Sequence, residues 1–280
     1  MKTIGIVGAG QMGCGIALVC ATAGLDVTLN DVDAQAAKRG INSISGNLAR
    51  MVSKGKMTSD EATAALGRIR AGGVLAELIE SDLVIEAATE NIQIKEDILR
   101  NLDAIVRPGS VIATNTSSVS VTRLGSMLGD PGRFIGMHFF NPVPVMALVE
   151  VIRGLRTSDA TVDATVAFTK RIGKQPICVS NSPGFVVNRI LVPMINEAIF
   201  VLQQGLASAE EIDEGMKLGA NHPIGPLALA DLIGLDTTLA IMNVLYADFS
   251  DSKYRPASLL KEMVDAGYLG RKSGRGFFTY

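Results

Sequence analysis

A glycine-rich loop near the N-terminus constrains the fold of this chain more than any other feature. The loop Gly8-Ala9-Gly10-Gln11-Met12-Gly13 directly follows the apolar run Thr3–Val7 and precedes apolar residues at helical spacing over 11–23. A second apolar run, Val27–Asn30, comes next. Strand, glycine turn, helix and strand therefore fit within about 30 residues, the size of one βαβ unit. This order predicts a Rossmann-type domain that binds a dinucleotide.

The residues of the loop have separate tasks in such a site. Gly8 permits a tight turn, Gly10 lets the backbone approach a pyrophosphate, and Gly13 lets the helix pack close to the strand. Gln11 and Met12 lie at the helix N-terminus, where N–H groups and the helix dipole attract phosphate. We expect these five residues to contact the cofactor.

Asp31 ends the second predicted strand, 18 residues after Gly13. A carboxylate there accepts hydrogen bonds from ribose hydroxyls and repels a 2′-phosphate. Asn30 is neutral, and no arginine follows to hold a phosphate. We expect NAD as the cofactor, with NADP possible but disfavoured. The alternative is that Asp31 is only a turn residue.

Apolar strands and helical segments alternate as far as about residue 181. Further strands are expected at 69–71, 83–87, 111–114, 134–137, 148–152 and 177–179, and helices at 92–106 and 159–172. Continuous apolar strands separated by helices indicate an α/β fold, with a doubly wound, mostly parallel sheet covered on both faces.

Two features interrupt this alternation. Between about 34 and 66, two helices with start signals at Asp33 and Thr58 form an inserted arm. Beyond residue 181 the pattern is helical, with no strand before 276–280. We expect an NAD-binding domain at 1–181 and an all-α domain at 182–280.

Composition excludes several classes of protein. A net charge of −2 argues against a nucleic-acid surface. Three cysteines, Cys14, Cys20 and Cys178, without a CxxC pair favour buried, reduced thiols, and two histidines without ligand spacing give no metal site. Glycines interrupt the apolar N-terminus, and no apolar segment is long enough to span a membrane. A cytoplasmic protein is the expectation.

His138 is the strongest candidate for a catalytic group. It lies just past the predicted strand 134–137, where open α/β sheets place ligand-binding residues. Glu150 follows 12 residues later on the next predicted strand and can brace the imidazole if the two strands lie side by side. Alcohol oxidation by NAD needs a base near neutral pH, which histidine supplies. The alternative is a structural histidine.

The chain resembles the L-3-hydroxyacyl-CoA dehydrogenase family over its full length, and within it the bacterial members that act on 3-hydroxybutyryl-CoA. The resemblance rests on segments 8–17 (GAGQMGCGIA), 86–90 (EAATE), 115–118 (NTSS), 138–143 (HFFNPV), 182–189 (SPGFVVNR) and 270–278 (GRKSGRGFF). Several such segments in order are far more specific than any one alone.

This resemblance implies hydride transfer between NAD and a short-chain 3-hydroxyacyl-CoA, giving the 3-ketoacyl-CoA. Its proposed catalytic group comprises His138 as general base, Glu150 bracing it and stabilising the imidazolium, Ser117 bound to the substrate oxygen, and Asn188 reaching that oxygen from the second domain. Its further cofactor contacts are Glu90, Lys95, Asn115 and Asn141. Simpler roles remain open: Ser117 as a helix cap, Asn188 as a cap or a link between helices, and Lys95 on a solvated face.

The inserted arm carries Arg50 and Lys54, four residues apart on one helical face, with Lys56 nearby. The resemblance implies that this arm holds the phosphates of CoA, for which point charges are suited. The alternative is a solvated basic edge.

Apolar residues in the second domain predict a homodimer. Ile190, Met194, Ile195, Ile199 and Leu202 exceed what one small domain would bury, and the family is commonly dimeric. Two other functions are weighed against the dehydrogenase. One is a β-hydroxyacid dehydrogenase of the hydroxyisobutyrate type, whose catalytic lysine is replaced here by Asn188-Arg189. The other is a non-catalytic NAD-binding structural relative.

Overall fold

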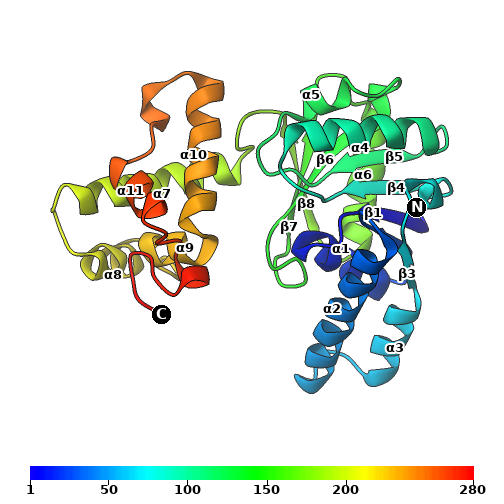
Figure 1. Ribbon diagram of the computed structural model, residues 1–280, viewed down its shortest axis with the longest axis horizontal. Coiled ribbons are helices and arrows are strands. Elements are labelled where there is room, and N and C mark those ends of the chain that lie inside the picture. Colours follow the sequence, from blue (N-terminus) through cyan, green and yellow to red (C-terminus); the bar gives the residue numbers. More distant parts are fainter. The chain divides into compact units, whose positions relative to one another are not determined.

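The chain forms two units in the computed structural model, which describes residues 1–280 (Figure 1). Unit 1 is residues 1–181 and unit 2 is residues 182–280. Unit 1 contains one eight-stranded sheet in the order β3-β2-β1-β4-β5-β6-β7-β8. Its strands are β1 (Thr3–Val7), β2 (Asp26–Asn30), β3 (Ile69–Gly72), β4 (Leu83–Glu86), β5 (Val111–Thr114), β6 (Phe134–Phe139), β7 (Leu148–Arg153) and β8 (Gln175–Ser180).

The strand order reverses direction between β1 and β4. From β1 the chain moves outward through β2 to β3, then returns to β4 and moves the other way through β5 to β6. All of these pairs are parallel. Because parallel crossovers are right-handed, the reversal puts helices on both faces and opens a crevice at the carboxyl ends of β1 and β4. The glycine loop follows β1 and therefore lies at this crevice.

Helices α1, α2 and α6 share one apolar core with the sheet, and α4 packs against α5. The helices of unit 1 are α1 (Gln11–Thr22), α2 (Ala34–Ser53), α3 (Ser59–Gly67), α4 (Ile92–Ile105), α5 (Val121–Gly125) and α6 (Asp159–Arg171). The α/β class with a doubly wound, mostly parallel sheet is confirmed.

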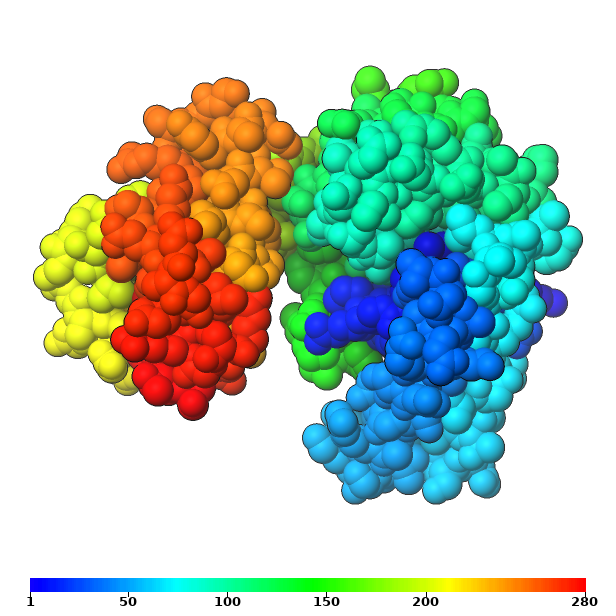
Figure 2. Space-filling view, viewed as in Figure 1, coloured from blue at the N-terminus to red at the C-terminus, as the bar shows by residue number.

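The inserted arm consists of α2 and α3, which extend from unit 1 in the space-filling view (Figure 2). Asp33 caps α2 by accepting from the Ala36 N–H at 2.6 Å. Thr58 and Glu61 form a reciprocal capping box at the start of α3. Helix α2 buries Ala37 and Ile44, whereas Arg50 and Ser53 in its last turn are exposed.

Most predicted strands and helices of unit 1 lie within two residues of their observed ends, but three features differ. Strand β6 continues to Phe139, so His138 lies inside the strand rather than past it, because pairing with β7 extends the ladder. The short helix α5, capped by Ser120, has no apolar periodicity long enough to predict it. Cys178 on edge strand β8 is exposed, not buried, whereas Cys14 and Cys20 are buried.

Unit 2 is helical. Its helices are α7 (Val187–Gln203), α8 (Ala209–Ala220), α9 (Pro226–Ile233), α10 (Leu235–Phe249) and α11 (Ser258–Asp265). No strand forms at 276–280, where only isolated bridges occur. Buried Asp231 accepts instead from the N–H groups of Phe277 and Phe278, which uses donors that a strand ladder would need.

The apolar stripe on α7 is mostly internal. Ile195 and Ile199 are fully buried in the core of unit 2, Met194 and Leu202 pack partly against it, and only Ile190 is largely exposed. The prediction that this stripe exceeds what the unit can bury is wrong, because α9 and α11 cover it. No single helix of the chain is long and apolar enough to cross a bilayer; only the sharply bent pair α9 and α10 has the required composition together.

Candidate active site

The glycine loop has one position shaped for a ligand and two that the fold itself requires. Gly8 has a φ of +108°, and a Cβ there would lie 2.5 Å from the Ala87 carbonyl oxygen. A Cβ on Gly13 would lie 1.8 Å from the Gly8 oxygen. Gly10, by contrast, faces open space, with nothing within 4 Å of the position that a Cβ would take. The backbone at Gly10 is therefore open to a phosphate, as a dinucleotide site requires.

A cavity of about 590 Å³ adjoins this loop at the ends of β2 and β4. Its walls include Val32, Val74, Ile94 and Ile98, which offer apolar surface for an adenine ring. Asn30 also lines this cavity, and its side-chain nitrogen Nδ2 is buried without a hydrogen-bond partner. An unpaired buried donor at this point fits a polar atom of a bound nucleotide. In the sequence Asn30 is only a neutral neighbour of Asp31, because local pattern does not reveal the burial of its side chain.

Asp31 lies between this cavity and a second one of about 630 Å³. Its carboxylate accepts from the N–H groups of Ala9, at 2.5 Å, and Val32, at 2.7 Å, so it also fixes the loop. Helix α2 brings Arg39 to the second cavity, beside Asp31. No arginine was expected to follow Asp31 to hold a phosphate; Arg39, about two helical turns later, lines this second cavity.

His138 and Glu150 are register partners in the antiparallel pair β6 and β7. The imidazole Nδ1 lies 2.7 Å from Oε2 of Glu150, and both side chains are buried. A hydrogen bond donated from Nδ1 to this carboxylate leaves Nε2 as the ring nitrogen that can accept a proton. The Asn115 side chain accepts from the Phe139 N–H at 2.9 Å and ties the end of β5 to β6 beside this pair.

Four further residues form one charged network at the ends of β4 and β5. Lys95 is 2 % exposed, so the alternative that it lies on a solvated helix face is wrong. It contacts both Glu86 and Glu90. Glu90 in turn accepts from the Ser117 hydroxyl at 2.8 Å and its N–H at 2.6 Å. Ser117 is not a helix cap; that task belongs to Ser120.

The Glu90 carboxyl group is held in its ionised form. Burial raises its pKa, but the charge of Lys95 and hydrogen bonds from Ser117 and Thr116 outweigh that effect, and the pKa lies below its usual range. The Ser117 hydroxyl proton therefore points to Glu90.

The remaining candidates are Asn141, Arg50, Lys54 and Asn188. Asn141 is exposed in the loop after β6. Arg50 and Lys54 are exposed at the end of α2, and neither forms an ion pair. Asn188 lies in the first turn of α7 in unit 2, half-buried; Val186, not Asn188, is the N-cap residue there.

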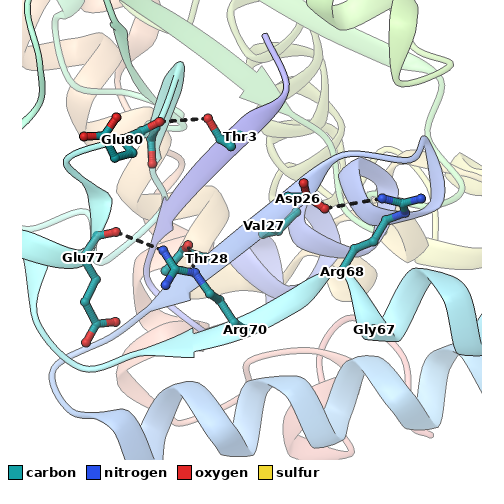
Figure 3. Close-up of a pocket in the computed structure, with 10 residues that line it drawn as sticks. Thr3, Asp26, Val27, Thr28, Gly67, Arg68, Arg70, Glu77 and Glu80 are labelled. Carbon is teal, nitrogen blue, oxygen red and sulfur yellow. Dashed lines mark hydrogen bonds and ion pairs between the residues drawn. The ribbon is translucent and has the colours of Figure 1, made fainter.

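Another cavity, of about 260 Å³, lies at the amino ends of β1, β2 and β3 (Figure 3). Both arginines in its wall have partners there: Arg68 pairs with Asp26 at 3.4 Å, and Arg70 donates to the Thr28 hydroxyl at 2.8 Å. It lies at the opposite ends of the strands from the glycine loop, so we do not assign the dinucleotide to it.

Comparisons with known proteins cover the whole chain. Residues 3–182 match the family model for the 3-hydroxyacyl-CoA dehydrogenase NAD-binding domain, and residues 184–280 match the model for the C-terminal domain of the same family. The 3-hydroxybutyryl-CoA dehydrogenase of Bradyrhizobium diazoefficiens is 54% identical over 280 residues, covering 100% of this chain and 96% of that protein. A probable 3-hydroxybutyryl-CoA dehydrogenase of Bacillus subtilis is 51% identical, covering 100% and 98%.

A solved structure is similarly close. The (S)-3-hydroxybutyryl-CoA dehydrogenase PaaH1 from Ralstonia eutropha has a TM-score of 0.97 and 59% identity, covering 100% of this chain and 99% of that one. These matches favour the predicted family over a lysine-dependent β-hydroxyacid dehydrogenase and over a non-catalytic relative.

Proposed function

The chain belongs to the 3-hydroxyacyl-CoA dehydrogenase family, whose members are NAD-dependent oxidoreductases, and we propose that it interconverts (S)-3-hydroxybutyryl-CoA and acetoacetyl-CoA. Other short-chain 3-hydroxyacyl-CoA thioesters belong to the same proposal. The observation that carries it is the buried contact of 2.7 Å between His138 and Glu150, within the domain that holds the glycine loop. The names of the similar proteins support the same substrate.

In this proposal His138 is the general base. Its Nε2 takes the proton of the 3-hydroxyl group, and Glu150 stabilises the imidazolium that forms, since the carboxylate already accepts from Nδ1. When bound, NAD accepts the hydride from C3 of the substrate. In the reverse direction His138 returns the proton to the alkoxide oxygen. The antiparallel pairing of β6 and β7 keeps His138 and Glu150 opposite each other in both directions of the reaction.

The cofactor is proposed to lie across the glycine loop. Gly10 gives its backbone to the pyrophosphate, while Asn30 and Asp31 at the end of β2 hold the adenosine. Gly8, Gln11, Met12 and Gly13 complete this part of the site. Glu90, Lys95, Asn115 and Asn141 are proposed at the nicotinamide end. The open space above Gly10 and the unpaired Asn30 amide fit such a ligand.

We propose four side-chain contacts to the acyl-CoA. We assign Ser117 and Asn188 to the substrate oxygen, and Arg50 and Lys54 to the phosphates of CoA. The absence of ion pairs at these two cations supports that assignment, because neither charge is neutralised by the protein.

We also propose a homodimer formed through unit 2, acting in the cytoplasm. Large apolar side chains are exposed on that unit outside the buried stripe, among them Leu206, Leu218 and Leu232. Sedimentation of the purified protein at several concentrations tests this: a single 29.5 kDa species throughout contradicts the dimer.

The activity is tested by following NADH absorbance with acetoacetyl-CoA. Wild-type protein is expected to oxidise NADH, and His138→Ala to lose at least about a hundredfold in kcat. An exposed-site control, Glu262→Gln on α11, is expected to retain full activity. An active His138→Ala protein contradicts the base assignment. A series of C4 to C16 substrates, with NADH and NADPH, then gives chain length and cofactor preference.

A further inference from the structure

Glu86 has no part in the chemistry proposed above, yet it is fully buried at the end of β4. Its carboxylate accepts from the Ala88 N–H at 2.8 Å, the Thr114 hydroxyl at 2.7 Å and the Lys95 ammonium at 2.9 and 3.0 Å. Removing a carboxylate from water costs several kcal/mol unless it is paired and hydrogen-bonded. Glu86 meets both conditions through groups that converge from β4, β5 and α4.

Lys95 depends on Glu86 for its position. An ammonium group has three donors, and here they face both oxygens of Glu86 and one oxygen of Glu90, the last at 3.4 Å. The two short contacts go to Glu86. Without that carboxylate, the flexible lysine side chain would retain only the longest contact, in a place where it is 2 % exposed.

Glu90 depends in turn on Lys95. The cation holds the carboxylate in its ionised form, and the carboxylate then accepts from three donors: the Ser117 N–H, the Ser117 hydroxyl and the Thr116 hydroxyl, at 2.6 to 2.9 Å. Ser117 is thus held at both its backbone and its side chain by one group. Charge-assisted hydrogen bonds of this kind are roughly twice as strong as neutral ones.

We infer that Glu86 is a positioning residue, which acts through Lys95 and Glu90 to fix the Ser117 hydroxyl in the active site. This inference rests on the proposed function, in which Ser117 contacts the substrate. Glu86 touches neither substrate nor cofactor in this role. Glu86 fixes the position of the Lys95 ammonium. Lys95 in turn keeps Glu90 ionised and in place, and Glu90 holds Ser117.

A double-mutant cycle tests the inference on turnover of acetoacetyl-CoA. The four proteins are wild type, Glu86→Gln, Ser117→Ala and the double variant, each with its thermal unfolding measured. Glu86→Gln is expected to lower kcat about tenfold, within the coupling found between residues of one network. In the Ser117→Ala background the same change is expected to have an effect of less than about twofold, because the serine it positions is gone.

A matched control is Asp213→Asn, which removes a buried carboxylate that caps α9 in unit 2. Its effect on kcat is expected to be the same with and without Ser117. If Glu86→Gln lowers kcat by the same factor in the presence and in the absence of Ser117, Glu86 is merely structural and the inference is overturned. If wild-type protein does not turn over at all, the proposed function fails and the inference fails with it.

A second variant covers the case in which Glu86→Gln does not fold. Glu86→Gln with Lys95→Met removes both buried charges, which proteins tolerate better than an unpaired one. Glu90 then lacks its cation and Ser117 its anchor, so this variant is expected to lower kcat about tenfold, but less than about twofold when Ser117 is already alanine. An equal loss in both backgrounds overturns the inference.

Discussion

His138 and Glu150 face each other across the antiparallel pair β6 and β7, with Nδ1 of the imidazole 2.7 Å from Oε2 of the carboxylate. The imidazole and the carboxylate therefore both stand on strands of one sheet, directly opposite each other, and not on loops. Both are buried, so the carboxylate acts in a medium of lower effective dielectric than water.

Glu150→Gln is expected to keep the fold and lower kcat by about 10² to 10⁴, because an amide can donate to Nδ1 and then favours the wrong tautomer. NADH absorbance with acetoacetyl-CoA measures the loss, and thermal unfolding reports the fold. Full activity in this variant contradicts a role for Glu150 in orienting His138.

Two glycines of the loop should respond differently to alanine. Gly10→Ala is expected to fold like wild type, since a Cβ there meets nothing, but to weaken NADH binding at least about tenfold because the methyl group occupies the path to the pyrophosphate. Gly13→Ala should destabilise the fold by about 1–3 kcal/mol or more, since its Cβ would overlap the Gly8 oxygen. NADH fluorescence and urea unfolding separate the two effects; equal behaviour of both variants contradicts the assignment.

Asp31→Asn is expected to shift preference toward NADPH. The amide keeps an acceptor for the Ala9 N–H while it removes the charge that repels a 2′-phosphate, and Arg39 already lines the adjoining cavity. We expect the ratio of NADPH to NADH dissociation constants to fall about tenfold, equivalent to roughly 1.4 kcal/mol. Adding Arg39→Ala should reverse much of this gain. An unchanged ratio in Asp31→Asn speaks against the ribose contact.

Arg50→Ala and Lys54→Ala are each expected to raise the KM for acetoacetyl-CoA about threefold to tenfold, with kcat unchanged. Added salt should shrink the difference, because exposed charges are screened. Lys38→Ala, an exposed lysine on the same helix, is the matched control and should behave like wild type. If all three variants have the wild-type KM, the arm does not bind CoA phosphates.

Asp103 should contribute to stability against acid. Burial alone would raise the pKa of Asp103. Hydrogen bonds from the Gly129 N–H and from Arg133, together with the charge of Arg133, outweigh burial, so the folded-state pKa lies below its usual value. Its contribution is fully present above the unfolded-state pKa of about 3.9 and is lost as pH falls through the folded-state pKa. Asp103→Asn should therefore cost about 1–2 kcal/mol at pH 7 and less at pH 3, by urea unfolding. A cost that does not depend on pH contradicts this account, and exposed Asp163→Asn should show none.

The positions of most strands and helices follow from local sequence. The run Thr3–Val7, the glycine loop and the periodic segment after it specify strand, turn and helix through contacts between near neighbours. The Asp33 cap and the Thr58 capping box are equally local and were predictable for that reason. The family resemblance then indicated which polar residues to examine.

Long-range pairing decided the rest. The sequence places Glu150 12 residues after His138, but only the antiparallel register of β6 and β7 makes them partners. Burial of Lys95, the role of Glu86, the unpaired amide of Asn30 and the return of Arg39 toward Asp31 all arise from elements brought together across the fold. Local propensity determines which segment forms a strand or a helix; which polar groups lose water and must find partners depends on what packs against them, and that is a property of the tertiary structure.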